Sequence, residues 1–300
     1  MMVEKILNYI NESGHSQAKT AQELGVSAPM LNQYLKGKYP NPEAIEDKAY
    51  EFFALKEKTA GRISKIEFVE TSIASEVYKI ISYCHINRCI GAIIGDAGIG
   101  KTKTSEKYAK EYSEVIIITA TAACNSLKII YKMIAKRLRL NENRNLFDLQ
   151  GDIRARLDGS NKLLIIDEAQ HLSTNSIDGI RCFNDQESDS DLEPVGIVLI
   201  GNHELRHKMS GKNELAQLFN RIQMQRCLYT NDVRLDDIKL LFPGLTEKSM
   251  SPELKFLHGI AQSKYGIRGA VKIFCNAANN KDNTLPGLQT MAKYMGLAAH

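Results

Sequence analysis

The sequence predicts an α/β protein in which a parallel five-stranded sheet lies between an N-terminal helix-turn-helix module and a small C-terminal helical subdomain. Three observations lead to this fold class. Apolar runs of strand length alternate with helical patterns from residue 89 to residue 228, and such alternation is typical of a parallel sheet covered by helices. Two short helical patterns flank a turn within residues 15–39, and strand patterns stop after residue 231. We therefore expect modules at residues 1–58, 59–230 and 231–300.

The N-terminal module has the residue spacing of a helix-turn-helix. Ala21 is small where two helices would touch, Gly25 can adopt the positive φ of the turn, and Leu31 can face inward. Ser27 is a candidate N-cap for the second helix, and Pro29 falls in its first turn. The spacing therefore predicts two short helices joined by a tight turn.

A recognition helix in this module would present four side chains to DNA. They are Asn32, Gln33, Lys36 and Lys38. Residues 1–58 carry seven Lys and Arg against eight Asp and Glu, so we expect modest DNA contact here. A small helical bundle without a DNA role is the alternative.

Residues 54–66 are charged and contain Gly61, and we interpret them as a linker. Five apolar, mostly β-branched runs then predict the strands of the sheet. They are CIGAII, EVIIIT, KLLIID, VGIVLI and RIQMQRCL. The C-terminal stretches DIKLLF, SPELKFLHGIAQSKYG and RGAVKIFCNAANNK are typical of helices, so we expect the last module to be a helical lid.

A glycine-rich loop with the pattern G-x-x-x-x-G-K-T follows the first predicted strand and opens a helix. It consists of Gly95, Asp96, Ala97, Gly98, Ile99, Gly100, Lys101 and Thr102. In this context, backbone N–H groups wrap nucleotide phosphates, the lysine reaches the β/γ oxygens and the threonine hydroxyl binds Mg²⁺. The sequence therefore predicts ATP and Mg²⁺ as cofactors.

Two carboxylates end the predicted strand KLLIID. Asp167 is placed to orient Mg²⁺ through water, and Glu168 to polarise the attacking water as general base. Two solvated acids at a strand end are the alternative, which the neighbouring phosphate loop disfavours.

Three further residues stand where a nucleotide site would use them. Asn202 follows the strand VGIVLI and could share the attacking water with Glu168; a simple turn residue is the alternative. Arg221 precedes the last strand and could reach a neighbouring subunit's nucleotide as an arginine finger, or form a surface salt bridge. Arg268 opens a lid helix and could close onto the γ-phosphate.

This set, in this order, resembles the AAA+ ATPases, whose phosphate loop, DE motif, sensor asparagine, arginine finger and lid arginine these residues match. The whole chain is similar to the B-type DNA transposition proteins of Mu-like bacteriophages, through IEFVETSIASEV, DEAQHL and GNHELRHKM. The resemblance implies an ATP-dependent, sequence-tolerant DNA-binding ATPase in the cytoplasm of a bacterial host. It also implies that the protein oligomerises on target duplex DNA and delivers it to a DDE transposase, stimulating strand transfer.

Basic residues gather between the second and third predicted strands. The candidates for contact with the DNA backbone are Lys128, Lys132, Lys136, Arg137 and Arg139. The three lysines recur at every fourth residue and so share one helix face, which a ring of subunits would turn into a positive track. A solvated helix face is the alternative. Residues 185–193 are acidic, and we expect a surface loop facing away from DNA.

Composition adds few constraints. The net charge of +4 permits an anionic partner. The six cysteines form no C-x-x-C pair, which favours reduced thiols over a zinc site. No signal peptide and no membrane-spanning run is predicted. Two alternative functions share these motifs: a nucleotide-switched helix-turn-helix regulator that reads one operator, and a helicase loader.

Overall fold

The computed structural model describes residues 2–63, 65–124, 126–185, 193–210, 221–245 and 252–297. The chain forms two compact units, residues 1–62 and residues 63–300. In the described part of the chain, no helix is long and apolar enough to cross a membrane.

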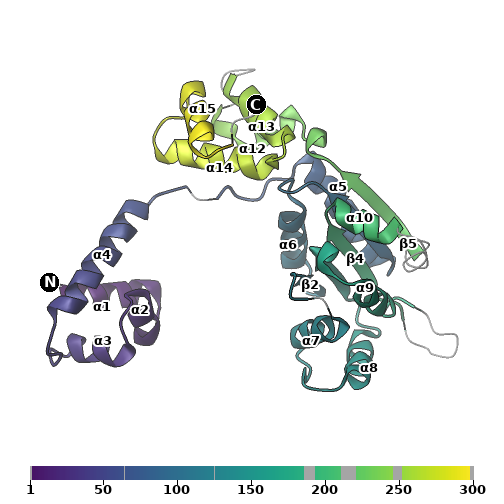
Figure 1. Cartoon of the computed structure of the whole chain (residues 1–300), viewed down its shortest axis with the longest axis horizontal. Coiled ribbons are helices and arrows are strands. Elements are labelled where there is room, and N and C mark those ends of the chain that lie inside the picture. Colours follow the sequence, from purple (N-terminus) through teal and green to yellow (C-terminus); the bar gives the residue numbers. More distant parts are fainter. Residues whose placement is uncertain are drawn as a thin grey trace. The chain divides into compact units, whose positions relative to one another are not determined.

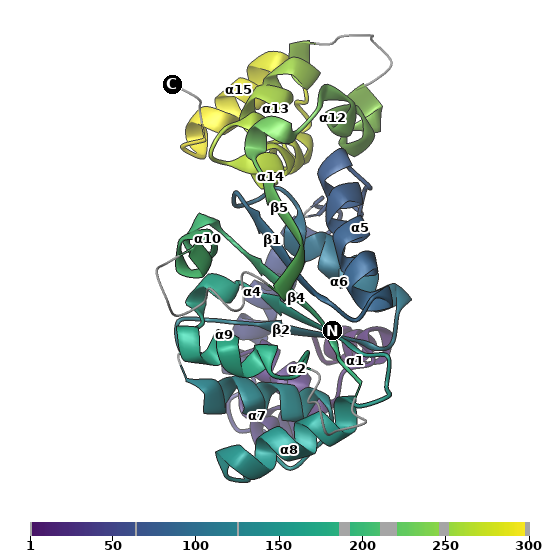
Figure 2. The same cartoon turned by 90° about the vertical axis from the view of Figure 1, so that its right-hand side faces the viewer.

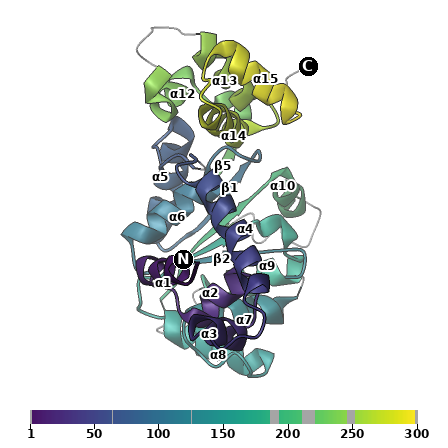
Figure 3. The ribbon, with the colours of Figure 1, turned by 90° about the vertical axis from the view of Figure 1, so that its left-hand side faces the viewer.

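The first unit is a bundle of four helices with its own apolar core (Figures 1 and 3). The helices are α1 (Met2–Ser13), α2 (Gln17–Glu23), α3 (Ala28–Leu35) and α4 (Glu43–Thr59). Gly25 has φ +67° in the turn between α2 and α3, and the Ser27 hydroxyl accepts the Met30 N–H to cap α3. The two expected short helices are therefore present, while their assignment as a DNA-binding helix-turn-helix stays a prediction.

Helix α4 extends further than the sequence indicated. Its first turns bury Ile45, Ala49 and Phe53, but the helix continues through residues 54–59, all of which are exposed. The linker expected from residue 54 therefore begins inside a helix, because an Ala-Leu-Lys-Glu run has high helix propensity even without a buried face.

The second unit contains a five-stranded sheet of order β2-β3-β4-β1-β5, in which every pairing is parallel (Figure 2). The strands are β1 (Ile90–Gly95), β2 (Val115–Thr119), β3 (Leu163–Asp167), β4 (Gly196–Gly201) and β5 (Ile222–Leu228). Each lies within a residue of an expected apolar run, so the predicted fold class is confirmed. The parallel pairing places the last residues of β1, β3 and β4 along one edge.

Helices cover both faces of this sheet. One face packs against α7 (Leu127–Arg137), α8 (Leu146–Leu157), α9 (Thr174–Arg181) and α10 (His203–Ser210). The other face packs against α5 (Ser72–Ile86) and α6 (Lys101–Glu111). Side chains of successive strand residues alternate between these two cores, which is why the central strands β1, β3 and β4 are buried throughout.

The C-terminal helices share the second core with α5 and α6. They are α12 (Leu235–Leu241), α13 (Pro252–Gln262), α14 (Gly266–Asn279) and α15 (Leu285–Tyr294), which Figure 2 shows grouped together. The expected helices are present, and α15 is an addition that the sequence did not suggest. The buried Asp237 carboxylate accepts the Ser72 N–H (2.6 Å) and hydroxyl (2.7 Å), tying α12 to the start of α5.

Candidate nucleotide site

The glycine-rich loop joins the end of β1 to the start of α6. Gly100 has φ +109° and precedes Lys101, the first residue of α6. Gly98 has φ +78°, and a Cβ atom there would lie 3.0 Å from the Tyr265 carbonyl oxygen. Both positions therefore need glycine, for backbone conformation and, at Gly98, also for space. The first turn of α6 presents free N–H groups at the loop, where anions bind.

The Lys101 side chain folds back over the glycine-rich loop. Its ammonium donates to the carbonyl oxygens of Gly95 (2.8 Å) and Asp96 (2.7 Å). Burial lowers the pKa of Lys101, while the carboxylates of Asp167 and Glu168 act in the opposite direction. The cation thus stands between the loop and the acidic end of β3.

Thr102 and Asp167 meet at the edge of the sheet. The Thr102 hydroxyl donates to Asp167 Oδ2 (2.7 Å), and Asp167 Oδ1 accepts the Glu168 N–H (3.0 Å). Burial raises the pKa of Asp167, and these two hydrogen bonds act against that rise. A hydroxyl and a carboxylate in contact suit Mg²⁺, which takes few protein ligands and keeps water and phosphate oxygens. Among the described residues, no cluster of three or more His, Cys, Asp or Glu side chains could hold a metal.

Glu168 is exposed and adopts a left-handed backbone conformation, with φ 56° and ψ 37°. This conformation costs a residue with a side chain on the order of 1 kcal/mol. Strain of this kind is often found at functional sites. Glu168 is exposed whereas Asp167 is buried, so the two acids of the pair have different surroundings.

Gln170 was missed by the sequence analysis and links the two polar strand ends. Its side-chain amide donates to Glu168 Oε2 (2.5 Å), and its Oε1 accepts the Asn202 N–H (3.3 Å). Asn202 itself caps α10 by accepting the Glu204 N–H (2.9 Å). The sequence signals were the position of Gln170 two residues after the general-base candidate and its place in the stretch DEAQHL.

Asp96 connects the loop to two other strand ends. Its carboxylate accepts the Thr230 N–H (2.8 Å) and lies 3.1 Å from His203 Nε2. Burial opposes ionisation of Asp96, but the hydrogen bonds from Thr230 and His203 outweigh it and lower the pKa of Asp96. His203 also stacks on Tyr229, with ring centroids 5.2 Å apart. His203 was not among the sequence candidates, although it directly follows Asn202.

Helix α14 contacts the loop through its main chain. The Arg268 N–H donates to the Gly98 carbonyl (3.0 Å), and a Cβ atom at Gly266 would lie 2.7 Å from the Ala97 carbonyl oxygen. The exposed Arg268 side chain is close enough to Lys101 for its charge to act against protonation of that lysine. The structure therefore brings Arg268 to the site at which Lys101, Asp167 and Glu168 meet.

Arg221 is not part of this group. It directly precedes β5, and β5 begins beside Ile90 while Leu228 pairs with Gly95. The two ends of a six-residue strand are roughly 17–20 Å apart, so Arg221 lies at the opposite edge of the sheet from the loop. Its exposed guanidinium forms an ion pair with Asp185. The chain does contain the surface salt bridge that was the alternative at this position.

The candidate DNA-binding residues lie apart from the loop. Asn32, Gln33, Lys36 and Lys38 are all exposed in the first unit. In the second unit, Lys128, Lys136, Arg137 and Arg139 are exposed and Lys132 is half-buried. Figures 1 and 2 show α7 and α8 at the end of the second unit away from α12–α15.

Two arginines of α8 and of the segment before it, which follow the α7 cations in the chain, form hydrogen bonds or ion pairs within the protein. Arg154 donates to the carbonyl oxygens of Cys182 (2.8 Å) and Asp185 (2.7 Å), and Arg144 pairs with Asp148 and Asp152. In the acidic stretch, residues 186–192 lie outside the described residues, while its ends, Asp185 and Glu193, form ion pairs with arginines. All six cysteines are free thiols.

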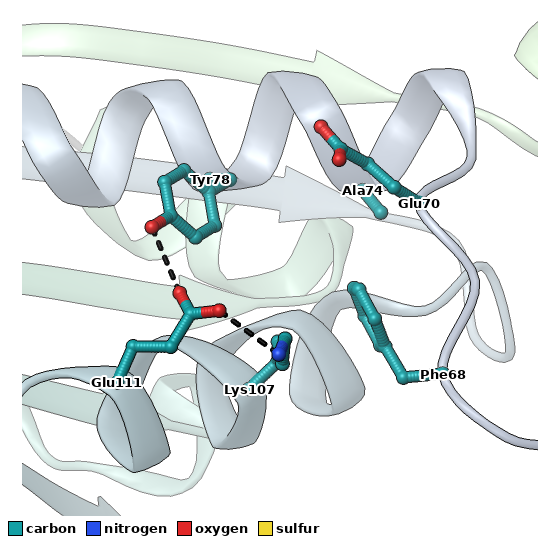
Figure 4. A pocket seen from close by; sticks show the side chains of 6 residues that line it. All are labelled: Phe68, Glu70, Ala74, Tyr78, Lys107 and Glu111. Atoms are coloured by element: carbon teal, nitrogen blue, oxygen red, sulfur yellow. Dashed lines mark hydrogen bonds and ion pairs between the residues drawn. The ribbon is translucent and has the colours of Figure 1, made fainter.

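A separate pocket of about 310 Å³ lies between α5 and α6, with the preceding segment on its rim (Figure 4). Phe68 and Glu70 face it from that segment, and Tyr78 and Lys107 face it from the helices. The Tyr78 hydroxyl donates to Glu111 (2.8 Å), which also pairs with Lys107 (2.9 Å). These lining residues are distinct from those of the glycine-rich loop.

The chain is similar to known proteins over much of its length. A family model described as "AAA domain" matches residues 86–209. The Mu-like prophage FluMu DNA transposition protein B of Haemophilus influenzae is 28% identical over 274 residues, covering 89% of this chain and 93% of the relative. The ATP-dependent target DNA activator B of Escherichia phage Mu is 28% identical over 253 residues, covering 83% and 78%.

Solved structures support the fold. The ORC2 protein of Aeropyrum pernix matches with a TM-score of 0.52 and 17% identity, over 79% of this chain and 70% of that one. CDC6P of Pyrobaculum aerophilum matches with a TM-score of 0.54 and 15% identity, over 78% and 69%. An AAA domain of the AAA+ P-loop fold is therefore present, and the resemblance to transposition proteins B is confirmed by homologues that span most of the chain.

Proposed function

We propose that this protein is an ATP-dependent, sequence-tolerant DNA-binding ATPase that oligomerises on target duplex DNA and delivers it to a DDE transposase. One observation carries the proposal: Lys101, the Thr102–Asp167 pair, Glu168 and the lid backbone at Arg268 all converge on one glycine-rich loop. The homologues that span most of the chain are named as a DNA transposition protein B and as an ATP-dependent target DNA activator B.

ATP would be held by charge and by backbone donors. The N–H groups of residues 98–102 would bind phosphate oxygens, and Lys101 would exchange its contacts with the loop carbonyls for the β/γ oxygens. Mg²⁺, when bound, would neutralise phosphate charge; Thr102 would ligate it, and Asp167 would hold one of its waters.

Hydrolysis would depend on Glu168 as general base, which accepts a proton from the attacking water. One oxygen, Oε2, is engaged by Gln170 (2.5 Å), which leaves Oε1 for the water. Asn202 would share that water through its side-chain amide, because its Oδ1 already caps α10. Arg268 would stabilise charge on the γ-phosphate from the lid.

Oligomerisation would complete the site. Arg221 lies at the far edge of its own sheet, so a phosphate that it stabilises must belong to another subunit. Exposed ion pairs contribute about 0–1 kcal/mol, so the Asp185 partner could be exchanged for the stronger charge-assisted contact with a phosphate. ATP would therefore control assembly as well as binding.

Duplex DNA would lie against the exposed and half-buried cations of α7 and its C-terminal turn. Lys128, Lys132, Lys136, Arg137 and Arg139 would contact phosphates, and repetition of that face around an oligomer would form a track. The first unit would add contacts from Asn32, Gln33, Lys36 and Lys38. Phosphate contacts carry no sequence information, which is why we propose a sequence-tolerant protein.

Electron microscopy with ATP and random-sequence duplex tests the proposal. We expect wild-type protein to cover the duplex with oligomers when ATP is present, and Lys101→Ala to bind neither ATP nor DNA stably. Normal ATP affinity in Lys101→Ala would refute the phosphate-loop assignment. A footprint at one operator sequence would instead favour a regulator, and binding to a hexameric helicase would favour a loader.

A further inference from the structure

We infer that Gln170 is a positioning residue that aims the Glu168 carboxylate and couples it to the end of β4. This inference rests on the proposed ATPase function and assigns a role to a residue outside the phosphate loop and the acidic pair. It begins from the side chain itself, which is almost fully buried at 5% exposure although it is polar. A buried amide needs hydrogen-bond partners, because leaving one unpaired costs about 1–3 kcal/mol.

Both ends of the Gln170 amide have partners at the proposed catalytic edge. The NH₂ group donates to Glu168 Oε2 (2.5 Å), and the carbonyl oxygen accepts the Asn202 N–H (3.3 Å). This orientation is chemically determined, since a carboxylate can only accept and a backbone N–H can only donate. Reversing the amide would break both bonds, so the two contacts fix the side chain in one orientation.

The backbone around Gln170 also forms hydrogen bonds with α10. Lys208, from α10, donates to the carbonyl oxygens of Gln170 and Leu172. Gly201 ends β4 against this side chain, and a Cβ atom there would lie 2.8 Å from Gln170 Oε1. Asn202 and Lys208, at the start and near the end of α10, therefore both hold the turn that follows Glu168 through hydrogen bonds.

The consequence concerns the position of the Glu168 carboxylate. Glu168 is exposed and sits on a strained turn, so its side chain would otherwise be free to rotate in solvent. Gln170 holds Oε2 and leaves Oε1 available for water, and any shift of the β4 end moves the amide that holds it. A displacement of Asn202 at the β4 end would thereby reach the general base through Gln170.

Three variants test this role with ATP and duplex DNA present. Gln170→Ala removes both contacts, and we expect kcat to fall by roughly 10–100-fold, a part of the 10²–10⁴ that a general base supplies, with ATP affinity within about threefold of wild type. Gln170→Glu keeps the length and the acceptor toward Asn202 but loses the donor toward Glu168. Gln150→Ala, on α8, is the matched control and should leave kcat unchanged.

The pH profile separates positioning from a structural role. In Gln170→Glu, the introduced carboxyl group can donate to Glu168 only when it is protonated, so its kcat relative to wild type should rise as the pH falls toward about 5. A flat ratio across that range would overturn the inference. Melting curves show whether each variant is folded, and Gln170→Glu keeps the test valid if Gln170→Ala is not.

A double-mutant cycle completes the test. If Gln170 acts through Glu168, adding Gln170→Ala to Glu168→Gln should cost almost nothing further in kcat. An equal loss in both backgrounds would overturn the inference and leave the ATPase proposal standing. Absence of ATP turnover in the wild-type chain would instead overturn the proposed function, and the positioning role with it.

Discussion

Lys101 and Lys128 are the same residue type in one compact unit, and their surroundings differ. Lys101 is largely enclosed, and its ammonium donates to two main-chain carbonyls. Lys128 is exposed at the start of α7, and its ammonium has no hydrogen bond or ion pair among the described residues. The first cation is placed by the backbone before any ligand arrives, whereas the second acquires a role only through a partner.

The difference shows which proposals rest on contacts already present in the structure and which depend on a partner. At the loop edge, charges, glycine conformations and hydrogen bonds point to one chemistry. At the α7 face, a row of cations is compatible with either DNA or water. Experiments at the loop should therefore produce large effects from single atoms, and experiments on α7 should produce graded effects from summed charge.

The largest effect is expected at Glu168. Glu168→Gln preserves shape and removes the base, so hydrolysis should fall by about 10²-fold or more while ATP binding persists and DNA complexes become longer-lived. Turnover and DNA dissociation rates measure this. Glu106→Gln, on the exposed side of α6, is the control. Wild-type turnover in Glu168→Gln would remove Glu168 from its role.

Arg221→Ala should cut turnover on DNA by roughly 10–100-fold, less than the 10³ or more seen for fingers in other phosphoryl-transfer systems. ATP binding by the isolated subunit should remain intact, because Arg221 lies at the other edge of its own sheet. DNA should stimulate wild type and barely stimulate the variant. Arg226→Ala, which removes another exposed arginine on β5, should behave as wild type.

Mixing sharpens the Arg221 test. Arg221→Ala keeps an intact loop and Lys101→Ala keeps an intact finger, so mixed oligomers on DNA should regain part of the activity. If mixed oligomers form and no activity returns, Arg221 is a surface cation paired with Asp185 and nothing more.

Removing charge from the α7 face should reduce the salt dependence of duplex binding. Each lost phosphate contact reduces the magnitude of the slope of log K against log salt by about 0.9. The triple alanine variant at Lys128, Lys132 and Lys136 should therefore have a slope whose magnitude is smaller by up to about 2.7. Alanine at Lys272, Lys281 and Lys293 removes the same charge from the lid helices and their connecting turn and is the control. Identical slopes in the two variants would mean that the α7 stripe is a solvated face.

The smallest effect is expected on the free energy of unfolding, from a matched pair of glycine substitutions. Gly98→Ala places a Cβ at φ +78°, close to Tyr265 and Arg268 of the lid, and should lower the free energy of unfolding by about 1–2 kcal/mol. Gly151→Ala, within α8, meets nothing within 4 Å and should raise it by about 0.5–1 kcal/mol. Urea unfolding measures both. Equal changes of the same sign would contradict the proposed strain at the loop.

The central strands β1, β3 and β4 were predictable because each is an apolar run buried on both faces. The glycine-rich loop was predictable because its spacing is set by phosphate geometry. Helix α15 was missed because it is short and carries no motif, although Thr284 caps it. The strand order was not predictable, since the runs do not encode their neighbours. Gln170 was missed because its contact depends on the left-handed turn at Glu168, a conformation that glutamate rarely adopts.

Because Arg221 lies at the edge opposite the loop, the number of complete ATP sites depends on whether an assembly is open or closed. If each finger serves the next subunit, an open chain of n subunits contains n − 1 complete sites, whereas a closed ring contains n. Turnover per subunit would then increase with chain length, and one terminal subunit would retain its ATP. That terminal subunit would act as a cap, protecting the assembly from disassembly at that end.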